Sequence, residues 1–559
     1  MEKLLQEVIK ALYNIEVTPQ ISRPAAEFGD YATNVALQLA GRTGKNPREV
    51  AEEIASKLRE TGAFSEVTIA GPGFINVRVS GSSIARQLED AWSATFGENK
   101  DGNGKTVVVE YPSPNMAKPY SVGHLRPGNQ GWAARRLMEA TGWKVITDNH
   151  LGDYGAPLGI WITGFRKLSS DEALDKDGVY ELGRVYIAMK KELKEEAERG
   201  ESALADEVQA WLLKYEAGDA EAIAYSERFN SISLEHIHTI MNRLKISTDF
   251  ELGEAFFAPK GKEAVQKLLE TGVAVQNDDG SIIVPLDGFD VPMLVQKSNG
   301  AALYATTDLA TILYREENWH PDRVIYAAGG EQQFYFTQLF VMTKKLGITT
   351  ELLHLWFGTI DQLNEDGSRE KMSSRKGVVL MEELLNEAEE KARAIVEGRG
   401  VSEEDVKKIA LGAIKYSDFI SDRRTNILFD WDTIFALTGV SGPYVQYAAV
   451  RVNKILRDNG QGNTFADDYD YNAEKDVIAK LLEYPEAVRR AANELEPHKV
   501  ASYLYELARE LNRYYETTPV AMDSVEPEVR EARLGLLAKA SHVFAHGLDL
   551  LGIEVPEQM

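Results

Sequence analysis

The hydrophobic positions of the first hundred residues predict a small module of helices followed by strands. Apolar residues recur at helical spacing over residues 1–14, 28–41 and 46–58. Residues 64–80 instead alternate between apolar and polar side chains around a Gly-Pro-Gly turn, a pattern typical of two paired strands. We therefore expect an α+β module over residues 1–98.

A different pattern begins after the polar linker at 97–105. Residues 105–111, KTVVVEY, are a continuous apolar run, which is typical of a strand buried on both faces of a parallel sheet. A helical segment at 131–142 and a second apolar run at 143–149 complete a strand–helix–strand unit. This unit is the core of a doubly wound nucleotide-binding fold. We expect this α/β domain to span residues 105–385.

The remaining patterns divide the chain further. Residues from about 165 to 250 are charged and helix-periodic, which indicates a helical insertion in the α/β domain. Strand-like runs then return at 281–286, 292–297, 323–329 and 353–360. From 386 to 559 nearly all positions follow a helical period, so we expect an all-helical C-terminal domain.

Composition excludes several classes of protein. The 559 residues carry a net charge of −25, so any nucleic-acid partner must be held by local basic surfaces. The absence of Cys excludes disulfides, thiolate metal sites and a Cys nucleophile. No apolar run approaches the roughly 18 residues of a membrane span, and the N-terminal helix lacks the pattern of a signal peptide. We expect a cytoplasmic protein without membrane contact.

The densest chemical signal is YPSPNMAKP at 111–119, followed by SVGHLR at 121–126. It lies where the first buried strand leads into a helix, at the edge where open α/β folds bind ligands. Helix-start amides favour anions there, Gly123 lets a nucleotide approach the backbone, and His124 can donate to a phosphate. Taken alone, a Pro-rich turn that ends a strand explains the segment equally well.

A second signal is KMSSRKG at 371–377. Three cations and two hydroxyl groups in seven residues suit a phosphate clamp, because phosphoryl transfer requires positive charge. In isolation, a solvated basic loop is the simpler interpretation. We assign no structural metal, because His542 and His546 have helical spacing but no third ligand.

In this order and about 250 residues apart, the two motifs resemble the paired signatures of class I aminoacyl-tRNA synthetases. Other segments narrow the resemblance to the arginyl-tRNA synthetase family. These segments are FGDYATN, GPGFIN, VVVEYPSPNMAKP, VGHLR, NHLGDYG, YATTD, GEQQFYFTQLF, GPYVQYAAVRVNKIL and LLGIEVPEQM. The resemblance covers essentially the whole chain and implies a Rossmann-like catalytic domain that activates arginine with ATP and transfers it to the 2′-hydroxyl of tRNA.

The resemblance assigns the activation chemistry to the two motifs, with His124 stabilising the reacting phosphate and Lys371 steadying the pyrophosphate. The implied catalytic residues are Lys118, His124, Lys371, Arg375 and Lys376. The implied ATP contacts are Ser121, Gly123, His124, Met372 and Ser373. ATP with Mg²⁺ enters as the substrate complex, and we expect no tightly bound cofactor and no covalent nucleophile.

The resemblance also implies an arginine site. A planar guanidinium requires carboxylates, and Asp308 and Glu254 match the acidic positions of the family. The other implied arginine contacts are Asn115, Tyr304 and Gln332. Two alternatives stay open, namely that Asp308 caps the following helix and that Tyr304 is a core residue.

The chain departs from the family pattern at three positions. Ser121 replaces the first His of the first motif, and its hydroxyl is shorter and carries no charge. Ser374 replaces the second Lys of the second motif, and Lys118 occupies the position of a Lys thought to substitute for it. Tyr335 stands where a His is common. The first two departures leave open which cation clamps the phosphates.

The implied partners are arginine tRNA, L-arginine and ATP, and we expect a monomer. On the N-terminal module, Phe74 and Asn76 match positions that contact tRNA, since RNA loops stack on exposed aromatic rings. Phe74 is nearly as well explained as a core residue. In the helical domain, the matching residues are Tyr444, Gln446, Tyr447, Arg451 and Met559.

Three other functions remain to be weighed. A non-catalytic paralogue acting as an RNA-binding adaptor finds support in Ser121 alone. A class I synthetase for another amino acid, such as cysteine, is disfavoured by the pair Glu254 and Asp308 and by the missing thiolate zinc site. A small-molecule nucleotidyltransferase needs neither the N-terminal module nor the helical C-terminal domain.

Overall fold

The computed structural model describes residues 1–22, 24, 28–298, 303–364, 366–372, 379–462, 469–522 and 524–559. The chain forms two compact units. The first unit comprises residues 1–97, 448–486 and 503–544, and the second comprises residues 98–447, 487–502 and 545–559.

The N-terminal module of the first unit is an antiparallel sheet in the order β1-β2-β4-β3, packed against three helices. The strands are β1 (Ile21–Ser22), β2 (Tyr31–Thr33), β3 (Phe64–Ala70) and β4 (Phe74–Val79), and the helices are α1 (Glu2–Tyr13), α2 (Val35–Thr43) and α3 (Pro47–Glu60). The apolar face of the sheet, with Ile75 and Val77 fully or almost fully buried, forms a core with Leu5, Ile9 and Ile54 of the helices. The α+β expectation for this module is confirmed.

One predicted element of the module is wrong. The expected helix over 28–41 begins only at Val35, and Tyr31–Thr33 forms strand β2 instead. Tyr31 pairs with Val77 of β4, and Thr33 accepts a hydrogen bond at 3.2 Å from the Val35 amide. Pairing with β4 therefore overrides the helical spacing of these residues, and the Thr33 hydroxyl marks where the helix takes over.

Helices complete the first unit. Helix α4 (Gly81–Ala91) contacts α18 (Lys475–Leu482), and the unit also contains parts of α17 (Gly442–Asn459), α20 (His498–Thr517) and α21 (Pro527–Leu550). The carboxylate of Glu474 is completely buried and accepts hydrogen bonds from Arg533 at 2.8 Å and from the Tyr514 hydroxyl at 3.1 Å. A buried charge must be paired in this way, so these bonds fix how the helices of this unit pack.

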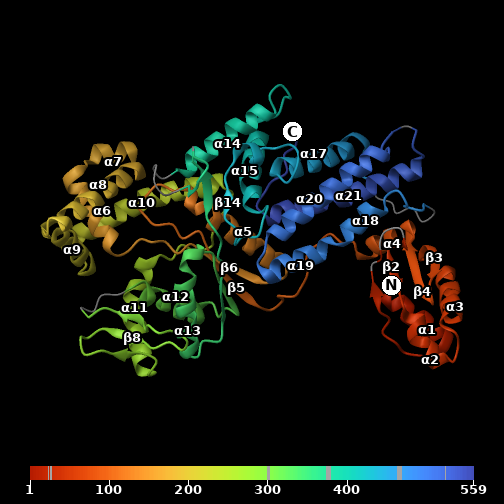
Figure 1. Cartoon of the computed structure of the whole chain (residues 1–559). Helices are drawn as coiled ribbons and strands as arrows, with labels where there is room; N and C mark the ends of the chain where they lie inside the picture. The colour runs from red at the N-terminus through yellow and green to blue at the C-terminus, as the bar shows by residue number, and fades with distance from the viewer. Residues whose placement is uncertain are drawn as a thin grey trace. The chain divides into compact units, whose positions relative to one another are not determined.

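The second unit is built on a parallel sheet in the order β11-β10-β5-β6, of which β5 and β6 are labelled in Figure 1. Its strands are β5 (Thr106–Glu110), β6 (Lys144–Asp148), β10 (Arg323–Tyr326) and β11 (Glu351–His354). Val107, Val108 and Val109 are completely buried, because β5 has neighbours on both edges and helices over both faces. The prediction of a buried parallel strand at this position is confirmed.

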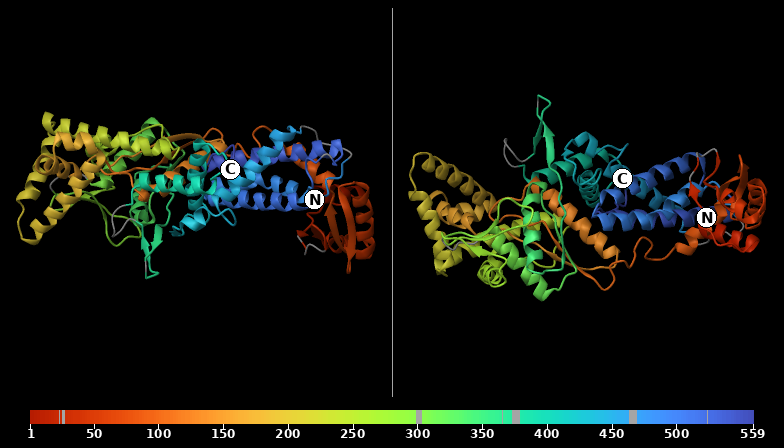
Figure 2. Two further views of the ribbon diagram at one scale, coloured as in Figure 1. Left: turned by 90° about the horizontal axis from the view of Figure 1, so that it is seen from above. Right: turned by 60° about the horizontal axis from the view of Figure 1, so that its bottom comes forward.

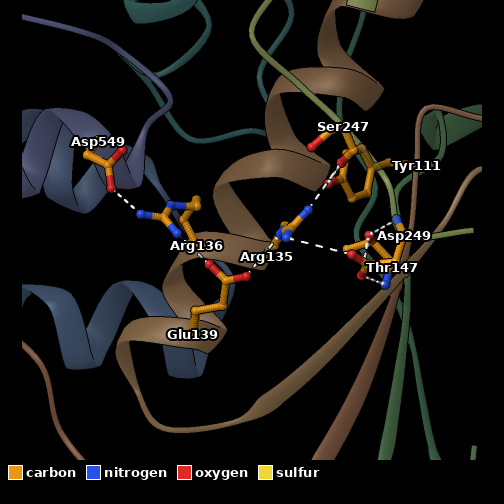
Figure 3. Close-up of polar contacts among 8 residues, drawn as sticks. All are labelled: Tyr111, Arg135, Arg136, Glu139, Thr147, Ser247, Asp249 and Asp549. Atoms are coloured by element: carbon orange, nitrogen blue, oxygen red, sulfur yellow. Dashed lines mark hydrogen bonds and ion pairs between the residues drawn. The ribbon is translucent and has the colours of Figure 1, made fainter. Parts of the chain in front are cut away.

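Helix α5 (Leu125–Ala140) links β5 to β6, and polar contacts fasten it in place (Figure 3). The Tyr111 hydroxyl donates to the Ser247 carbonyl at 2.7 Å, and Arg135 donates to the same carbonyl at 3.3 Å. Gly131 lets Tyr111 lie directly on the helix, since a Cβ at Gly131 would be 2.3 Å from the Cβ of Tyr111. These contacts fix where the chain leaves β5, which is where the first motif begins.

Two insertions separate β6 from β10. The first is a helical group, seen in gold to yellow in Figure 2, that consists of α6 (Ala156–Leu168), α7 (Asp171–Asp177), α8 (Val179–Glu198), α9 (Ala203–Glu216) and α10 (Ala220–Arg243). The second contains α11 (Glu254–Glu270), the antiparallel strands β7 (Val275–Gln276), β8 (Ile282–Val284) and β9 (Met293–Gln296), and α12 (Tyr304–Asn318). The predicted helical insertion is confirmed.

Two strand predictions after β10 need correction. The run at 353–360 is not one strand, because β11 ends at His354 and β12 (Ile360–Leu363) belongs to another sheet. The Gly358 amide donates to the Arg423 carbonyl at 2.9 Å, so the chain leaves the parallel sheet before β12 begins. Strand β12 pairs with β13 (Arg369–Lys371) and with β14 (Ile427–Leu428), a short strand inside the block expected to be helical.

The rest of the second unit is helical. Its elements are η2 (Val122–His124), η3 (Gly330–Gln332), α13 (Gln333–Lys345), α14 (Met381–Ile395), α15 (Glu403–Asp418), α16 (Trp431–Ile434) and part of α19 (Tyr484–Glu494). Arg126 of α5 is buried and bonds to Asp418 of α15 at 2.8 Å, which fixes the helical block to the start of α5. Among the described residues, no helix combines the length and apolarity needed to span a bilayer.

We predict that Gly131→Ala destabilises the chain although alanine is the better helix former. The added Cβ would overlap Tyr111, and such overpacking costs about 1–3 kcal/mol, more than the roughly 1 kcal/mol that alanine gains in a helix. The apparent midpoint of thermal unfolding measures the effect. Gly41→Ala on α2 is the matched control, because no atom lies within 4 Å of its added Cβ. A midpoint unchanged in Gly131→Ala would contradict the prediction.

Candidate functional site

The two motifs meet at the carboxyl edge of the parallel sheet. The Val122 amide donates to the Val379 carbonyl at 3.0 Å, and the Met381 amide donates to the Tyr120 carbonyl at 2.9 Å. The chain that follows the second motif therefore pairs antiparallel with the first motif. Met372 packs on the same apolar cluster as Tyr120 and Val122. Two segments about 250 residues apart in the sequence thus share one edge of the sheet.

The first motif is held from behind by the helical insertion. The Ala117 amide donates to the Ser233 hydroxyl at 2.8 Å, and the Tyr120 amide donates to His236 Nε2 at 3.1 Å. Both acceptors belong to α10. The insertion therefore sets the path of the backbone between β5 and η2.

His124 is the central group of the first motif. Its Nδ1 lies 3.2 Å from both the amide nitrogen and the hydroxyl of Ser121. Nδ1 also lies 3.3 Å from the Ser121 carbonyl, so one tautomer accepts from the Ser121 amide and the other donates to the Ser121 carbonyl. Burial lowers the pKa of His124 to about 4, so the ring is neutral at pH 7. His124 is therefore a neutral ring whose orientation is set by the main chain and the hydroxyl of Ser121.

Some of the remaining motif residues are exposed to solvent, and the others lie outside the described residues. Gly123 is exposed, and a Cβ there would meet only the Ser121 hydroxyl, at 3.4 Å, so its backbone is open to a ligand. Lys371 is exposed at the end of β13, and the Met372 amide donates to the Ile360 carbonyl at 2.9 Å. The predicted Ser373, Arg375 and Lys376, together with Ser374, lie outside the described residues.

Two carboxylates, Glu254 and Asp308, lie near the starts of α11 and α12, two helices that pack against each other, and we name this pair the carboxylate pocket. Glu254 is the first residue of α11, and Tyr304 is the first residue of α12. Asp308 follows one turn after Tyr304 and accepts a hydrogen bond from the Tyr335 hydroxyl. Asp308 is therefore not a helix cap, and Tyr304 is 68% exposed and not a core residue.

Both pocket carboxylates have raised pKa values in the ligand-free chain. Burial raises the pKa of Glu254 from its ordinary 4.5 to about 7, and nearby Asp308 contributes to the rise. Burial likewise raises the pKa of Asp308 from 3.8 to about 6, against the opposing effects of His150 and Tyr335. Two partly desolvated carboxyl groups that repel each other favour a cationic ligand.

The structure adds residues that sequence reasoning missed. His150 Nε2 lies 4.0 Å from Asp308, and neither ring nitrogen has a hydrogen-bond partner among the described residues. Asp153 accepts a hydrogen bond at 2.8 Å from the Ala255 amide and thereby supports the first turn of α11 beside Glu254. Both residues directly follow β6, so their place at the carboxyl end of a parallel strand is the signal that could have found them.

Asn115 and Gln332 lie at the same edge of the sheet. Asn115 forms a parallel bridge with Gly152, where a Cβ would come within 2.5 Å of the Asn115 amide oxygen. The absence of a side chain at Gly152 therefore allows the first motif and the loop after β6 to touch. Gln332 ends η3, directly after β10, and its side chain is exposed.

The predicted tRNA residues differ in exposure. In the first unit, Phe74 is 41% exposed and so is not a core residue, whereas Asn76 is buried. Arg451 lies over the ring of Tyr515, with its guanidinium carbon 4.4 Å from the ring centroid.

In the second unit, Tyr444 is half-buried, Tyr447 is 43% exposed and Gln446 is completely buried. The Gln446 amide donates to the Glu554 carbonyl at 2.9 Å, and Met559 packs on the apolar cluster that includes Val122. Gln446 thus anchors the C-terminal segment, and its role toward tRNA stays a prediction.

One cluster has the geometry of a metal site. Asp422, Glu496 and His498 each place one ligand atom within 4.8 Å of the others. Arg424 donates to Asp422 at 2.7 Å and to Glu496 at 2.6 Å, and its hydrogen bond lowers the pKa of Asp422. Because Arg424 pairs with both carboxylates and Lys499 lies 3.1 Å from Glu496, the two acids already have two cationic partners, and we assign no metal to this cluster.

Three protein-family descriptions together match most of the chain. The family described as "tRNA synthetases class I (R), catalytic domain" matches residues 90–431. The family "Arginyl tRNA synthetase N terminal domain" matches residues 1–79, and "DALR anticodon binding domain" matches residues 445–559. The chain belongs to the arginyl-tRNA synthetase family.

Individual arginyl-tRNA synthetases are similar to this chain over nearly its full length. The arginine–tRNA ligase of Clostridium perfringens is 35% identical over 100% of this chain and 99% of that protein. The arginine–tRNA ligase of Fusobacterium nucleatum is 33% identical over 98% of this chain and 96% of that protein. The fold is similar to that of the Thermus thermophilus arginyl-tRNA synthetase, with a TM-score of 0.77, 24% identity and coverage of 100% of this chain and 99% of the other.

The pocket carboxylates of this arginyl-tRNA synthetase are expected to reduce the stability of the ligand-free chain. A carboxyl group whose pKa is higher in the folded than in the unfolded chain lowers the free energy of unfolding most at a pH above that raised pKa. At such a pH the folded protein must bury the charged form of the group. We predict that Glu254→Gln raises the apparent unfolding midpoint at pH 8 by about 1–3 °C and has little effect below pH 4.5. The exposed Glu263→Gln on α11 is the matched control. A lower midpoint for Glu254→Gln at pH 8 would exclude this interpretation.

Proposed function

We propose that the chain is an arginine–tRNA ligase whose single active site lies at the carboxyl edge of the β11-β10-β5-β6 sheet. One observation carries the proposal, namely that the loop after β6 contacts both the first motif and the start of α11. Gly152 forms a bridge with Asn115, and the neighbouring Leu151 carbonyl accepts a hydrogen bond at 2.9 Å from the Glu254 amide. A cation with a carboxylate end, such as arginine, suits such a site, because its guanidinium faces the acids and its carboxylate faces the bound triphosphate.

The proposed roles in arginine binding follow the chemistry of each group. Glu254 and Asp308 bind the guanidinium, and Tyr335 orients Asp308 through its hydroxyl. Tyr304 and Gln332 border the side chain of arginine, and Asn115 binds its α-amino or carboxylate end. An arginine fork is favoured over a lysine ammonium because two carboxylates can accept several of its five donors.

The first reaction is adenylate formation. An oxygen of the arginine carboxylate attacks the α-phosphorus of ATP while the bond from that phosphorus to pyrophosphate breaks. His124 donates from Nε2 to a phosphate oxygen that gains charge, and the Gly123 backbone allows ATP to approach. Magnesium enters as part of the ATP substrate, and cations of the second motif, Lys371 among them, together with Lys118 steady the leaving pyrophosphate.

The second reaction transfers arginine to RNA. The terminal ribose 2′-hydroxyl of arginine tRNA attacks the carbonyl carbon of the adenylate, and AMP leaves. We propose that residues 105–385 carry the chemistry, that residues 1–98 contact the tRNA through Phe74, and that residues 386–559 contact it through Tyr444, Tyr447 and Arg451. The tRNA-facing roles rest on exposure and on family membership.

The decisive experiment is charging of total tRNA with each of the twenty amino acids in the presence of ATP and magnesium. We expect arginine alone to be charged, because only its guanidinium pairs with both pocket carboxylates. Asp308→Ala should remove charging, since one carboxylate of the pair is lost. Charging of cysteine or lysine in preference to arginine would refute the proposal, and tRNA binding without any charging would favour an adaptor.

Arginine binding is expected to weaken as the pH falls. Glu254 and Asp308 have pKa values raised to about 7 and about 6, so they are charged above pH 7 and lose their charge in turn below it. Affinity for L-arginine should fall about tenfold per pH unit below 7 and more steeply below 6. Titration calorimetry with the free chain measures this dependence. In Glu254→Gln the decrease near pH 7 should vanish, and a flat profile between pH 8 and 6 in the unchanged protein would contradict the assignment.

A further inference from the structure

Two lysines approach the same tyrosine ring beside the first motif. Lys118 Nζ lies 4.5 Å from the centroid of Tyr186, and Lys190 Nζ lies 5.8 Å from it. Tyr186 and Lys190 belong to α8 of the helical insertion, whereas Lys118 belongs to the loop after β5. A cation–π contact with one ring accounts for each lysine separately, but it does not neutralise either charge.

Helix α8 packs closely against the first motif at this point. A Cβ at Gly183 would lie 2.9 Å from the Pro119 side chain, so the helix and the loop are in contact there. Lys118 is half-buried, and burial together with nearby Lys190 lowers its pKa. Lys118 is also close enough to His124 to lower the pKa of that ring. The two ammonium groups and the imidazole therefore share one region.

Neither of the two lysines at the Tyr186 ring is paired with a carboxylate in the part of the chain that the structure describes. Among the described residues, neither Lys118 nor Lys190 has a carboxylate oxygen within 4.0 Å, although the chain carries a net charge of −25. Other lysines of α8 do have such partners, since Lys191 lies 3.8 Å from Glu195 and Lys194 lies 3.8 Å from Glu198. Two neighbouring cations left unneutralised in an acidic protein favour an anionic ligand.

We propose that Lys190 and Lys118 form a two-cation clamp, across the ring of Tyr186, for the pyrophosphate portion of ATP. The clamp rests on the proposed function and assigns to the helical insertion a catalytic cation. The clamp would supply a positive charge that the second motif lacks, because Ser374 stands where the family motif has its second lysine. The leaving pyrophosphate gains negative charge as its bond to the α-phosphorus breaks, and the two ammonium groups stabilise that charge.

The test compares Lys190→Ala, Lys190→Arg and Lys191→Ala. Lys191 is the matched control, because it is the neighbouring lysine on α8 and pairs with a carboxylate. Titration calorimetry with magnesium pyrophosphate measures the clamp directly, without arginine or tRNA. Single-turnover adenylate formation, and separately transfer to tRNA from added arginyl-adenylate, measure the two reactions.

We expect Lys190→Ala to weaken pyrophosphate binding and to slow adenylate formation, each about tenfold, because one charge-assisted contact is lost. Lys190→Arg should stay within about threefold of the unchanged protein, and Lys191→Ala within about twofold. Transfer from arginyl-adenylate should not change.

Unchanged pyrophosphate binding in Lys190→Ala would overturn the clamp. Slower transfer with unchanged adenylate formation would also overturn it, because Lys190 would then serve an RNA phosphate. If the unchanged chain fails to charge arginine while Lys190→Ala still loses pyrophosphate affinity, the clamp is supported and the proposed function alone is refuted.

Discussion

The site depends on one buried ion cluster at the carboxyl end of the parallel sheet. Glu110 ends β5 and Asp148 ends β6, and the two residues are direct neighbours in the register of these strands. Arg315 of α12 is completely buried and bonds to Glu110 at 2.7 Å and to Asp148 at 2.8 Å. Two adjacent carboxylates inside the protein would repel each other without this guanidinium. Removing one partner of such a cluster typically costs about 3–5 kcal/mol.

The cluster positions both walls of the carboxylate pocket. Arg315 lies two turns after Asp308 on the same helix, so its bonds to the sheet fix the depth and rotation of Asp308. The other oxygen of Asp148 accepts a hydrogen bond at 3.0 Å from the Leu252 amide, two residues before Glu254. A single aspartate at the end of β6 therefore holds the helix that carries one pocket acid and the segment that leads to the other.

Sequence reasoning found what local patterns encode. The apolar run before Tyr111 required a doubly buried strand, and the first motif had to follow it at the ligand-binding edge of the sheet. Spacing misled at Tyr31–Thr33, because strand pairing with β4 outweighed an ambiguous period. Contacts between distant segments had no local signal. The hydrogen bond from Tyr335 to Asp308 and the approach of Lys190 to Lys118 arise only when the fold brings their elements together.

The proposed active site holds charged groups of both signs that lack a strong ionic partner among the described residues. Other buried ions are paired, as in Arg315 with Asp148 and Arg533 with Glu474. At the site, Glu254 has a raised pKa and Lys118 a lowered one, so each charge is held at an energetic cost set by desolvation. In the proposed function, arginine and ATP carry the complementary charges, so that their joint binding relieves both costs at once. A ligand that supplies only one of the two charges relieves only one of these costs, because the opposite set of groups stays desolvated and unpaired as in the free chain.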